Sequence, residues 1–159
     1  KMLHSGHSII HPEAYVLKRA VSPHAAANEE RVEIDLSKIQ LPETNGNDLV
    51  IEGAGGLLVP INATAVVADL ITQFDAEVIL VSNHYLGSIN HTLLTAQELK
   101  RRNIKVKGII FNGPSNVETE KIILSHTGYK LLLHVYPEKE ITTAVINAYA
   151  VKLFENWNE

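Results

Sequence analysis

The sequence predicts an α/β fold, a parallel sheet flanked by helices on both faces. After about residue 48, short apolar runs alternate with longer amphipathic stretches, which is the order of strands and crossover helices. The short runs are apolar throughout, as in strands that are buried on both faces. In such sheets ligands bind beyond the carboxyl ends of the strands. The residues that follow each strand are therefore the candidates for function.

The part of the chain before about Asn47 reads as irregular, with one helix start. Ser22 is a favourable N-cap, Pro23 suits the first helical position, and alanines follow at residues 25–27. Residues 42–48 are dense in turn formers and predict a surface loop. The first strand is expected at Leu49–Ile51.

The rest of the chain alternates regularly. Strands are expected at residues 78–81, 106–111 and 131–135. Helices are expected at 64–73, 89–102, 117–127 and 141–157. The second helix should place Leu93, Leu94 and Leu99 on one side. Gly128 is expected to terminate the third helix.

Length and composition favour one domain, residues 1–159. The net charge is −4 and no basic patch stands out, so no nucleic-acid partner is expected. No apolar run approaches the roughly 20 residues of a membrane span, so no membrane partner is expected. The absence of cysteine excludes disulfides and thiolate zinc sites, and it fits a reducing, cytoplasmic location.

The sharpest local signal is Glu52-Gly53-Ala54-Gly55-Gly56, directly after the first strand. A carboxylate at this point can hold Mg²⁺ beside phosphate groups. Glycines allow backbone N–H groups to approach an anion closely. A tight turn with an ordinary polar terminus explains the same residues, and the motif alone leaves both interpretations open.

Two further loops follow strands. In the loop before the second helix, Ser88 or Asn90 is a candidate helix cap that offers polar groups to a ligand. Asn112-Gly113 follows the strand at 106–111, where the amide suits the edge of a base. Simple capping and a simple turn are the alternatives, and local physics favours them.

The eight histidines predict no metal site. His4, His7 and His11 lie close together without carboxylates between them. The histidines of the second half are scattered over separate elements, at positions 84, 91, 126 and 134. A serine hydrolase is equally unsupported, because no G-x-S-x-G occurs.

Taken in order, several segments resemble dethiobiotin synthetase, a family of the P-loop NTPase superfamily. These are His11–Tyr15, Ser22–His24, Val50–Gly56, Val78–Val81, Leu86–His91 and Gly108–Asn112. The resemblance covers nearly the whole chain, which corresponds to about the C-terminal two-thirds of the family domain. It implies a P-loop-NTPase-like sheet without its N-terminal strand and P-loop.

The resemblance also implies an activity. The family joins CO₂ to 7,8-diaminononanoate: one amine forms a carbamate, the γ-phosphate of ATP activates it, and the second amine closes the ureido ring. The products are dethiobiotin, ADP and phosphate, in biotin biosynthesis. Mg²⁺ and ATP are required, and the family works as a homodimer.

Residue roles follow from matching positions. Glu52 matches the catalytic, Mg²⁺-binding and ATP-binding carboxylate. The remaining ATP-binding positions are Gly53, Ala54, Gly55, Asn112, Gly113, Tyr136, Pro137 and Glu138. The substrate-binding positions are Ser22, Gly55, Gly87, Ser88 and Asn90, the last three reaching the substrate carboxylate across the dimer.

The sequence departs from the family in two places. No G-x-x-x-x-G-K-[ST] loop occurs and none precedes Lys1, so we expect the 159 residues alone to be inactive. Tyr136 stands where the family usually has proline. Two alternatives stay open: a non-catalytic regulatory or dimerisation module of this family, and a cobyrinate-synthase-like amidotransferase ATPase domain.

Overall fold

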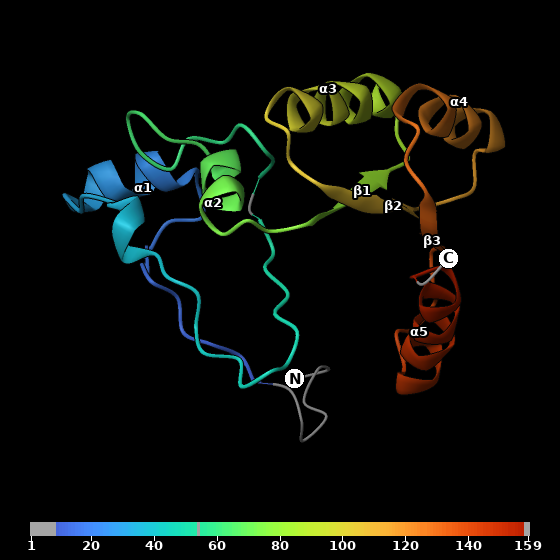
Figure 1. Ribbon diagram of the computed structural model, residues 1–159, viewed down its shortest axis with the longest axis horizontal. Helices are drawn as coiled ribbons and strands as arrows, with labels where there is room; N and C mark the ends of the chain where they lie inside the picture. Colours follow the sequence, from blue (N-terminus) through green and yellow to red (C-terminus); the bar gives the residue numbers. More distant parts are fainter. Residues whose placement is uncertain (1–8, 54, 158–159) are drawn as a thin grey trace. The chain divides into compact units, whose positions relative to one another are not determined.

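A computed structural model describes residues 9–53 and 55–157 (Figure 1). The chain divides into two compact units, Lys1–Asp75 and Ala76–Glu159, and each is described by itself. The expectation of one domain over residues 1–159 stays a prediction.

The described residues of the first unit form two short α-helices and one 3₁₀ turn. Helix α1 spans Pro23–Glu30, the 3₁₀ turn η1 spans Leu36–Lys38, and α2 spans Val67–Gln73. Helix α1 begins as predicted, with Ser22 as N-cap and Pro23 at the first position. The core of the first unit consists of three buried side chains, Ala27, Ile34 and Ile61. Partly buried side chains pack against them: Tyr15, Leu17, Leu36, Ile39, Val67 and Leu70.

The strand predicted at Leu49–Ile51 is wrong. The segment has no strand geometry, and Val50 and Ile51 are 91% and 54% exposed. No backbone hydrogen bond joins it to another described residue. An extended segment is stable as a strand only when a neighbour pairs with its N–H and C=O groups, and apolar composition cannot supply that neighbour.

Helix α2 begins at Val67, three residues later than the predicted start at residue 64. The reason is a turn closed by Asn62, whose side-chain oxygen accepts the N–H groups of Thr64 (3.0 Å) and Ala65 (2.9 Å). Asparagine side chains commonly compete with helical hydrogen bonds in this way. The helix then starts where Asp69 accepts the N–H of Val66 at 2.7 Å.

The second unit is a parallel sheet, as predicted, and its strands lie in the order β1-β2-β3. Its strands are β1 (Val78–Asn83), β2 (Val106–Asn112) and β3 (Leu131–Val135). The connecting helices α3 (Ser88–Arg101) and α4 (Val117–Thr127) lie on one face of the sheet. Helix α5 (Thr143–Trp157) lies on the other and packs against β3 (Figure 1).

The core of the second unit lies under α3 and α4. It joins strand and helix side chains that are almost fully buried: Leu80, Ala96, Ile109, Phe111 and Ile123. Leu99 also points inward, whereas Leu94 is 55% exposed, so its predicted place beside Leu93 and Leu99 is wrong. Gly108 lets β2 and β3 approach closely, because a Cβ there would lie 2.6 Å from Leu132 Cγ.

Helix α4 has both ends defined by local sequence. The Asn116 side chain accepts the N–H of Thr119 at 3.1 Å and caps its start. Gly128 ends it with a φ of 68°, which glycine adopts without strain. Among the residues described, no helix combines the length and apolar character that crossing a membrane would need.

Candidate functional site

The three strands of the second unit end at one edge, and polar groups gather there. The side-chain amide of Asn112 donates to Asn83 Oδ1 at 2.8 Å. The N–H of His84 donates to the Asn112 carbonyl at 3.0 Å, and the N–H of Gly113 donates to the Val135 carbonyl at 3.0 Å. These bonds bring the predicted base-binding pair, Asn112 and Gly113, next to the residues that follow β3.

The predicted ATP-binding segment after β3 is held by helix α5. The ring of Tyr136 stacks on the ring of His134, with 4.1 Å between their centroids. The backbone N–H of Tyr136 donates to Tyr149 Oη at 3.0 Å. Tyr149 in turn donates to Glu138 Oε1 at 2.7 Å, and this bond raises the pKa of the tyrosine. Pro137 lies exposed between them. Asn112, Gly113 and residues 136–138 therefore share one edge.

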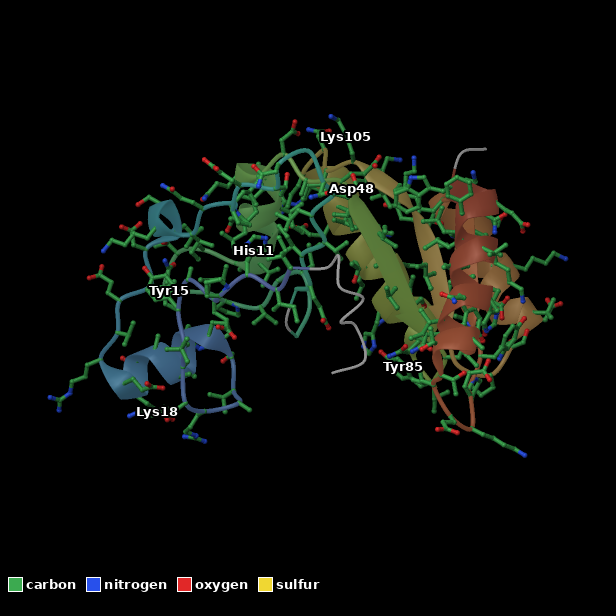
Figure 2. The ribbon with its side chains drawn as sticks, turned by 90° about the horizontal axis from the view of Figure 1, so that it is seen from below. His11, Tyr15, Lys18, Asp48, Tyr85 and Lys105 are labelled. Atoms are coloured by element: carbon green, nitrogen blue, oxygen red, sulfur yellow. The ribbon has the colours of Figure 1, made fainter. Side chains whose placement is uncertain are left out.

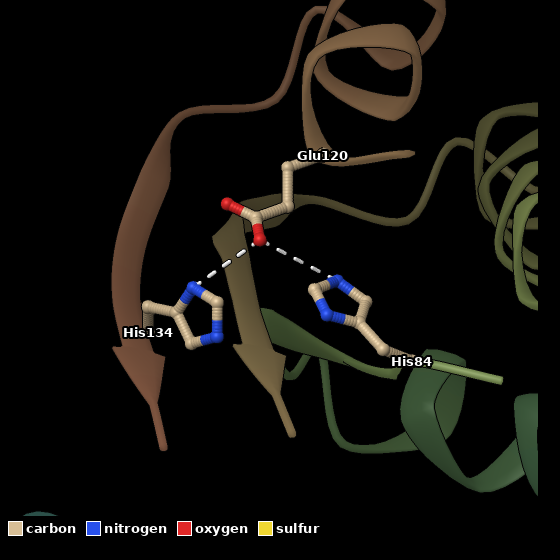
Figure 3. Close-up of side chains that lie close together, drawn as sticks. All are labelled: His84, Glu120 and His134. Carbon is tan, nitrogen blue, oxygen red and sulfur yellow. Dashed lines mark ion pairs between the residues drawn. The ribbon is translucent and has the colours of Figure 1, made fainter. Parts of the chain in front are cut away.

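Immediately beneath this edge lies a histidine–carboxylate cluster that the sequence did not predict. His84 follows β1, His134 lies in β3, and Glu120 projects from α4 toward both rings (Figure 3). His84 and His134 lie on separate elements, as expected, but the fold brings them together. The signal in the sequence is that each lies near the carboxyl end of an expected strand. That both strands border β2 is a finding of the structure.

The predicted substrate segment at residues 87–90 forms the start of α3. Gly87, with a φ of 99°, occupies the N-cap, so neither Ser88 nor Asn90 caps the helix. The reason is that Ser88 lies inside the first turn, where it is 3% exposed, whereas Asn90 is exposed to solvent. The segment presents Asn90 while burying Ser88.

Apolar side chains surround this helix start. Tyr85, Leu86 and Ile89 are 55%, 103% and 37% exposed. Figure 2 shows Tyr85 at the end toward which β1 points. Its hydroxyl lies 2.5 Å from His91 Nδ1, which fixes the ring against the helix.

The first unit carries the other predicted site residues. Glu52 and Gly53 are exposed, and no ion pair of Glu52 occurs within the described part of the chain. Ala54 lies outside the described residues. Gly55 and Gly56 have φ values of 77° and 118°, which only glycine adopts readily. The loop ends against α2, whose Ala68 N–H donates to the Leu57 carbonyl at 3.0 Å.

Ser22 is an N-cap whose side chain makes no capping hydrogen bond. Its carbonyl accepts the N–H groups of Ala25 and Ala26, at 3.0 and 3.1 Å, so the backbone alone closes the first turn. Ser22 is half-buried, and its hydroxyl makes no hydrogen bond to the helix that it precedes. Glu52 and Ser22 belong to one unit, and Asn112 and Asn90 to the other.

Comparisons with known proteins place this geometry in context. A family model described as "AAA domain" matches residues 1–145. An ATP-dependent dethiobiotin synthetase BioD from Cytophaga hutchinsonii is 79% identical over 158 residues, which cover 99% of this chain and 77% of that relative. The BioD of Christiangramia forsetii is 45% identical, over 96% of this chain and 72% of the relative. The BioD of Paramagnetospirillum magneticum is 40% identical, over 86% of this chain and 66% of the relative.

Proposed function

The chain belongs to the ATP-dependent dethiobiotin synthetase family, and we propose that it contributes that family's reaction, the ATP-dependent closure of a ureido ring on 7,8-diaminononanoate with CO₂. The observation that supports the proposal best is the identity of 79% over 99% of the chain. A regulatory module or a cobyrinate-synthase-like domain would not be expected to keep this identity along its whole length.

Glu52 is the proposed Mg²⁺ ligand. Its carboxylate is exposed and makes no ion pair with the described residues, so it is available to a hard cation. Mg²⁺ there would neutralise phosphate charge during transfer. The glycines beside it leave backbone N–H groups free to approach an anion, which is the role proposed for Gly53, Ala54 and Gly55.

Asn112 is the proposed reader of the adenine base. Its amide NH₂ already donates to Asn83, which fixes the side chain and leaves the amide oxygen to accept from the exocyclic amine of adenine. Gly113 and residues 136–138 line the same edge and are the proposed neighbours of the base.

Ser22 and the start of α3 are the proposed substrate contacts. Ser22 offers a hydroxyl that its own helix does not use. In the first turn of α3, the N–H groups of Ile89 and Asn90 have no backbone partner among the described residues, and such groups favour a carboxylate. The exposed Tyr85, Leu86 and Ile89 beside Asn90 are suited to pack against a second copy of the chain. A homodimer and a cytoplasmic location are parts of this proposal.

The test is turnover after Glu52→Gln, measured in the chain fused behind the family's Walker A segment. Formation of dethiobiotin from diaminononanoate, bicarbonate and Mg·ATP is expected to fall by about 10²–10³-fold, the usual loss when one charge-stabilising group is removed. Glu77→Gln is the matched control, because Glu77 is an exposed carboxylate at the amino end of β1. Equal turnover in the Glu52→Gln variant and the unaltered fusion would refute the assignment of Glu52.

A further inference from the structure

We propose that His84, Glu120 and His134 form a binding site for a divalent transition-metal ion, separate from any Mg²⁺ that serves ATP. Each of the three side chains offers one ligand atom, and these atoms lie within 4.8 Å of one another (Figure 3). The proposal is independent of the reaction proposed above, because it rests on residues that no predicted role includes.

His84 shows which of its nitrogens is left for an ion. Its Nδ1 lies 2.6 Å from the Pro114 carbonyl, which only accepts, so Nδ1 carries a proton and donates it. Its Nε2 is buried and has no hydrogen-bond partner among the described residues. The side chain is 7% exposed, so water cannot easily satisfy that nitrogen. The nitrogen faces Glu120 Oε1 at 3.8 Å.

His134 repeats the arrangement with its nitrogens exchanged. Its Nε2 donates to the Gly113 carbonyl at 3.0 Å, and its Nδ1 faces Glu120 Oε1 at 3.4 Å. Metal-binding histidines almost always donate the N–H of their other nitrogen to a carbonyl, carboxylate or water, which orients the ring. Both rings are oriented in this way, by carbonyls from the same segment after β2.

Glu120 is fixed by the start of α4. Its Oε1 accepts the N–H of Asn116 at 2.9 Å and the hydroxyl of Ser115 at 3.2 Å. The carboxylate is therefore held in place without contributions from the histidines. In the neutral form of each imidazole, the nitrogen that donates to the backbone carbonyl carries the proton, and the other nitrogen turns its lone pair toward the Glu120 carboxylate. A cation between them removes that repulsion.

Two of the three ligand-atom distances are close to those of a tetrahedral site, and all three lie within 4.8 Å. With bonds of about 2.0–2.1 Å, neighbouring ligand atoms of a tetrahedral zinc site lie about 3.4 Å apart. The distance from His134 Nδ1 to Glu120 Oε1 matches this value, and the distance from His84 Nε2 exceeds it by a few tenths of an ångström. The planes of the two rings stand at 83° to each other, and their centroids lie 5.5 Å apart.

The ligand types select the ion. Two imidazoles with one carboxylate suit Zn²⁺, Co²⁺, Ni²⁺ or Cu²⁺, whereas Mg²⁺ prefers oxygen ligands alone. Three protein ligands leave a fourth position for water. An ion here would join β1, β3 and α4, and through the carbonyls of Gly113 and Pro114 it would stabilise the segment that follows Asn112.

The test is a titration of the chelator-treated chain with Co²⁺ and Zn²⁺. We expect visible absorption typical of tetrahedral Co²⁺ at one equivalent, displaced by Zn²⁺ and unaffected by excess Mg²⁺. Glu120→Gln and His84→Gln should each weaken Zn²⁺ binding by more than 10–100-fold, which is the usual loss when a residue that only hydrogen-bonds to a metal ligand is replaced. The amide oxygen introduced by Glu120→Gln can still accept the Asn116 N–H, so this variant tests the site even if His84→Gln fails to fold.

His126→Gln is the matched control, because His126 is an exposed histidine of α4 outside the cluster. It should bind Co²⁺ as the unaltered chain does, and Trp157 fluorescence should confirm that every variant is folded. Equal Zn²⁺ affinity in all four proteins would overturn the proposal. So would nitrogen NMR spectra in which both rings carry two protons at pH 7 with Zn²⁺ present, since a proton would then occupy the place of the ion.

Discussion

A buried hydroxyl pair anchors the start of α3 to the sheet. Ser82 Oγ of β1 lies 2.7 Å from Thr92 Oγ1 of α3, and the two residues are 3% and 6% exposed. Truncating one partner leaves the other without a hydrogen bond where water cannot reach, which costs about 1–3 kcal/mol. Ser82→Ala and Thr92→Val should therefore both lower the free energy of unfolding of the second unit.

The two losses should differ in size. Threonine in a helix can turn its hydroxyl to the carbonyl one turn earlier, so Thr92 has a substitute partner when Ser82 is lost. Ser82 lies in a strand and has no such carbonyl one turn away. We therefore expect Ser82→Ala to lower the free energy of unfolding by about 1 kcal/mol, and Thr92→Val to lower it by about 2–3 kcal/mol.

The assay is urea unfolding followed by the fluorescence of Trp157, the single tryptophan, which lies in α5 and so reports on the second unit. The double variant should lose less free energy of unfolding than the two single variants lose in sum, because two apolar groups then face each other. Ser125→Ala, an exposed position in α4, should change stability by no more than about 0.5 kcal/mol. Strictly additive losses, or single losses as small as the control's, would refute the role of the pair.

Two further predictions concern packing and pH. Gly108→Ala should destabilise the second unit by about 1–3 kcal/mol in the same urea assay, because its new methyl group would lie 2.6 Å from Leu132 Cγ; unchanged stability would show that β3 can move away. Hydrogen bonds from Arg101 and then Arg102 lower the pKa of Glu98 to about 2, and carboxyl NMR should find it there. Since the folded pKa lies below the ordinary 4.5, the stabilisation is complete above pH 4.5 and is lost as the pH falls through about 2. Glu98→Gln should remove this part of the acid sensitivity, and a normal pKa for Glu98 would contradict the assignment.

The parts of the fold that the sequence predicts well are those with local signals at both ends. Helix α4 and strand β3 have the predicted bounds, because Gly128 ends the helix and an apolar run follows it. The parallel direction of the strands follows from the alternation of strands and helices. Leu49–Ile51 is the contrast: its composition suits a strand, but strand formation depends on a pairing partner that no local pattern reveals.

The candidate site divides in the same way. The position of Asn112 beside the residues after β3 could be predicted, since parallel strands end at one edge. The cap of α3 could not, because Ser88 and Asn90 are better caps by type than Gly87, and burial of Ser88 decides the outcome. The cluster of His84, Glu120 and His134 depends on strand order and on the side chosen by α4, which sequence spacing does not encode.

This chain belongs to a family of enzymes that build a ureido ring with ATP. The most direct measurement supplies ¹³C-bicarbonate, diaminononanoate and Mg·ATP to the chain fused behind the family's Walker A segment. We expect dethiobiotin labelled at its ureido carbon, formed in equal amounts with ADP. Release of ADP without labelled product, or no consumption of ATP by the folded fusion, would contradict this expectation.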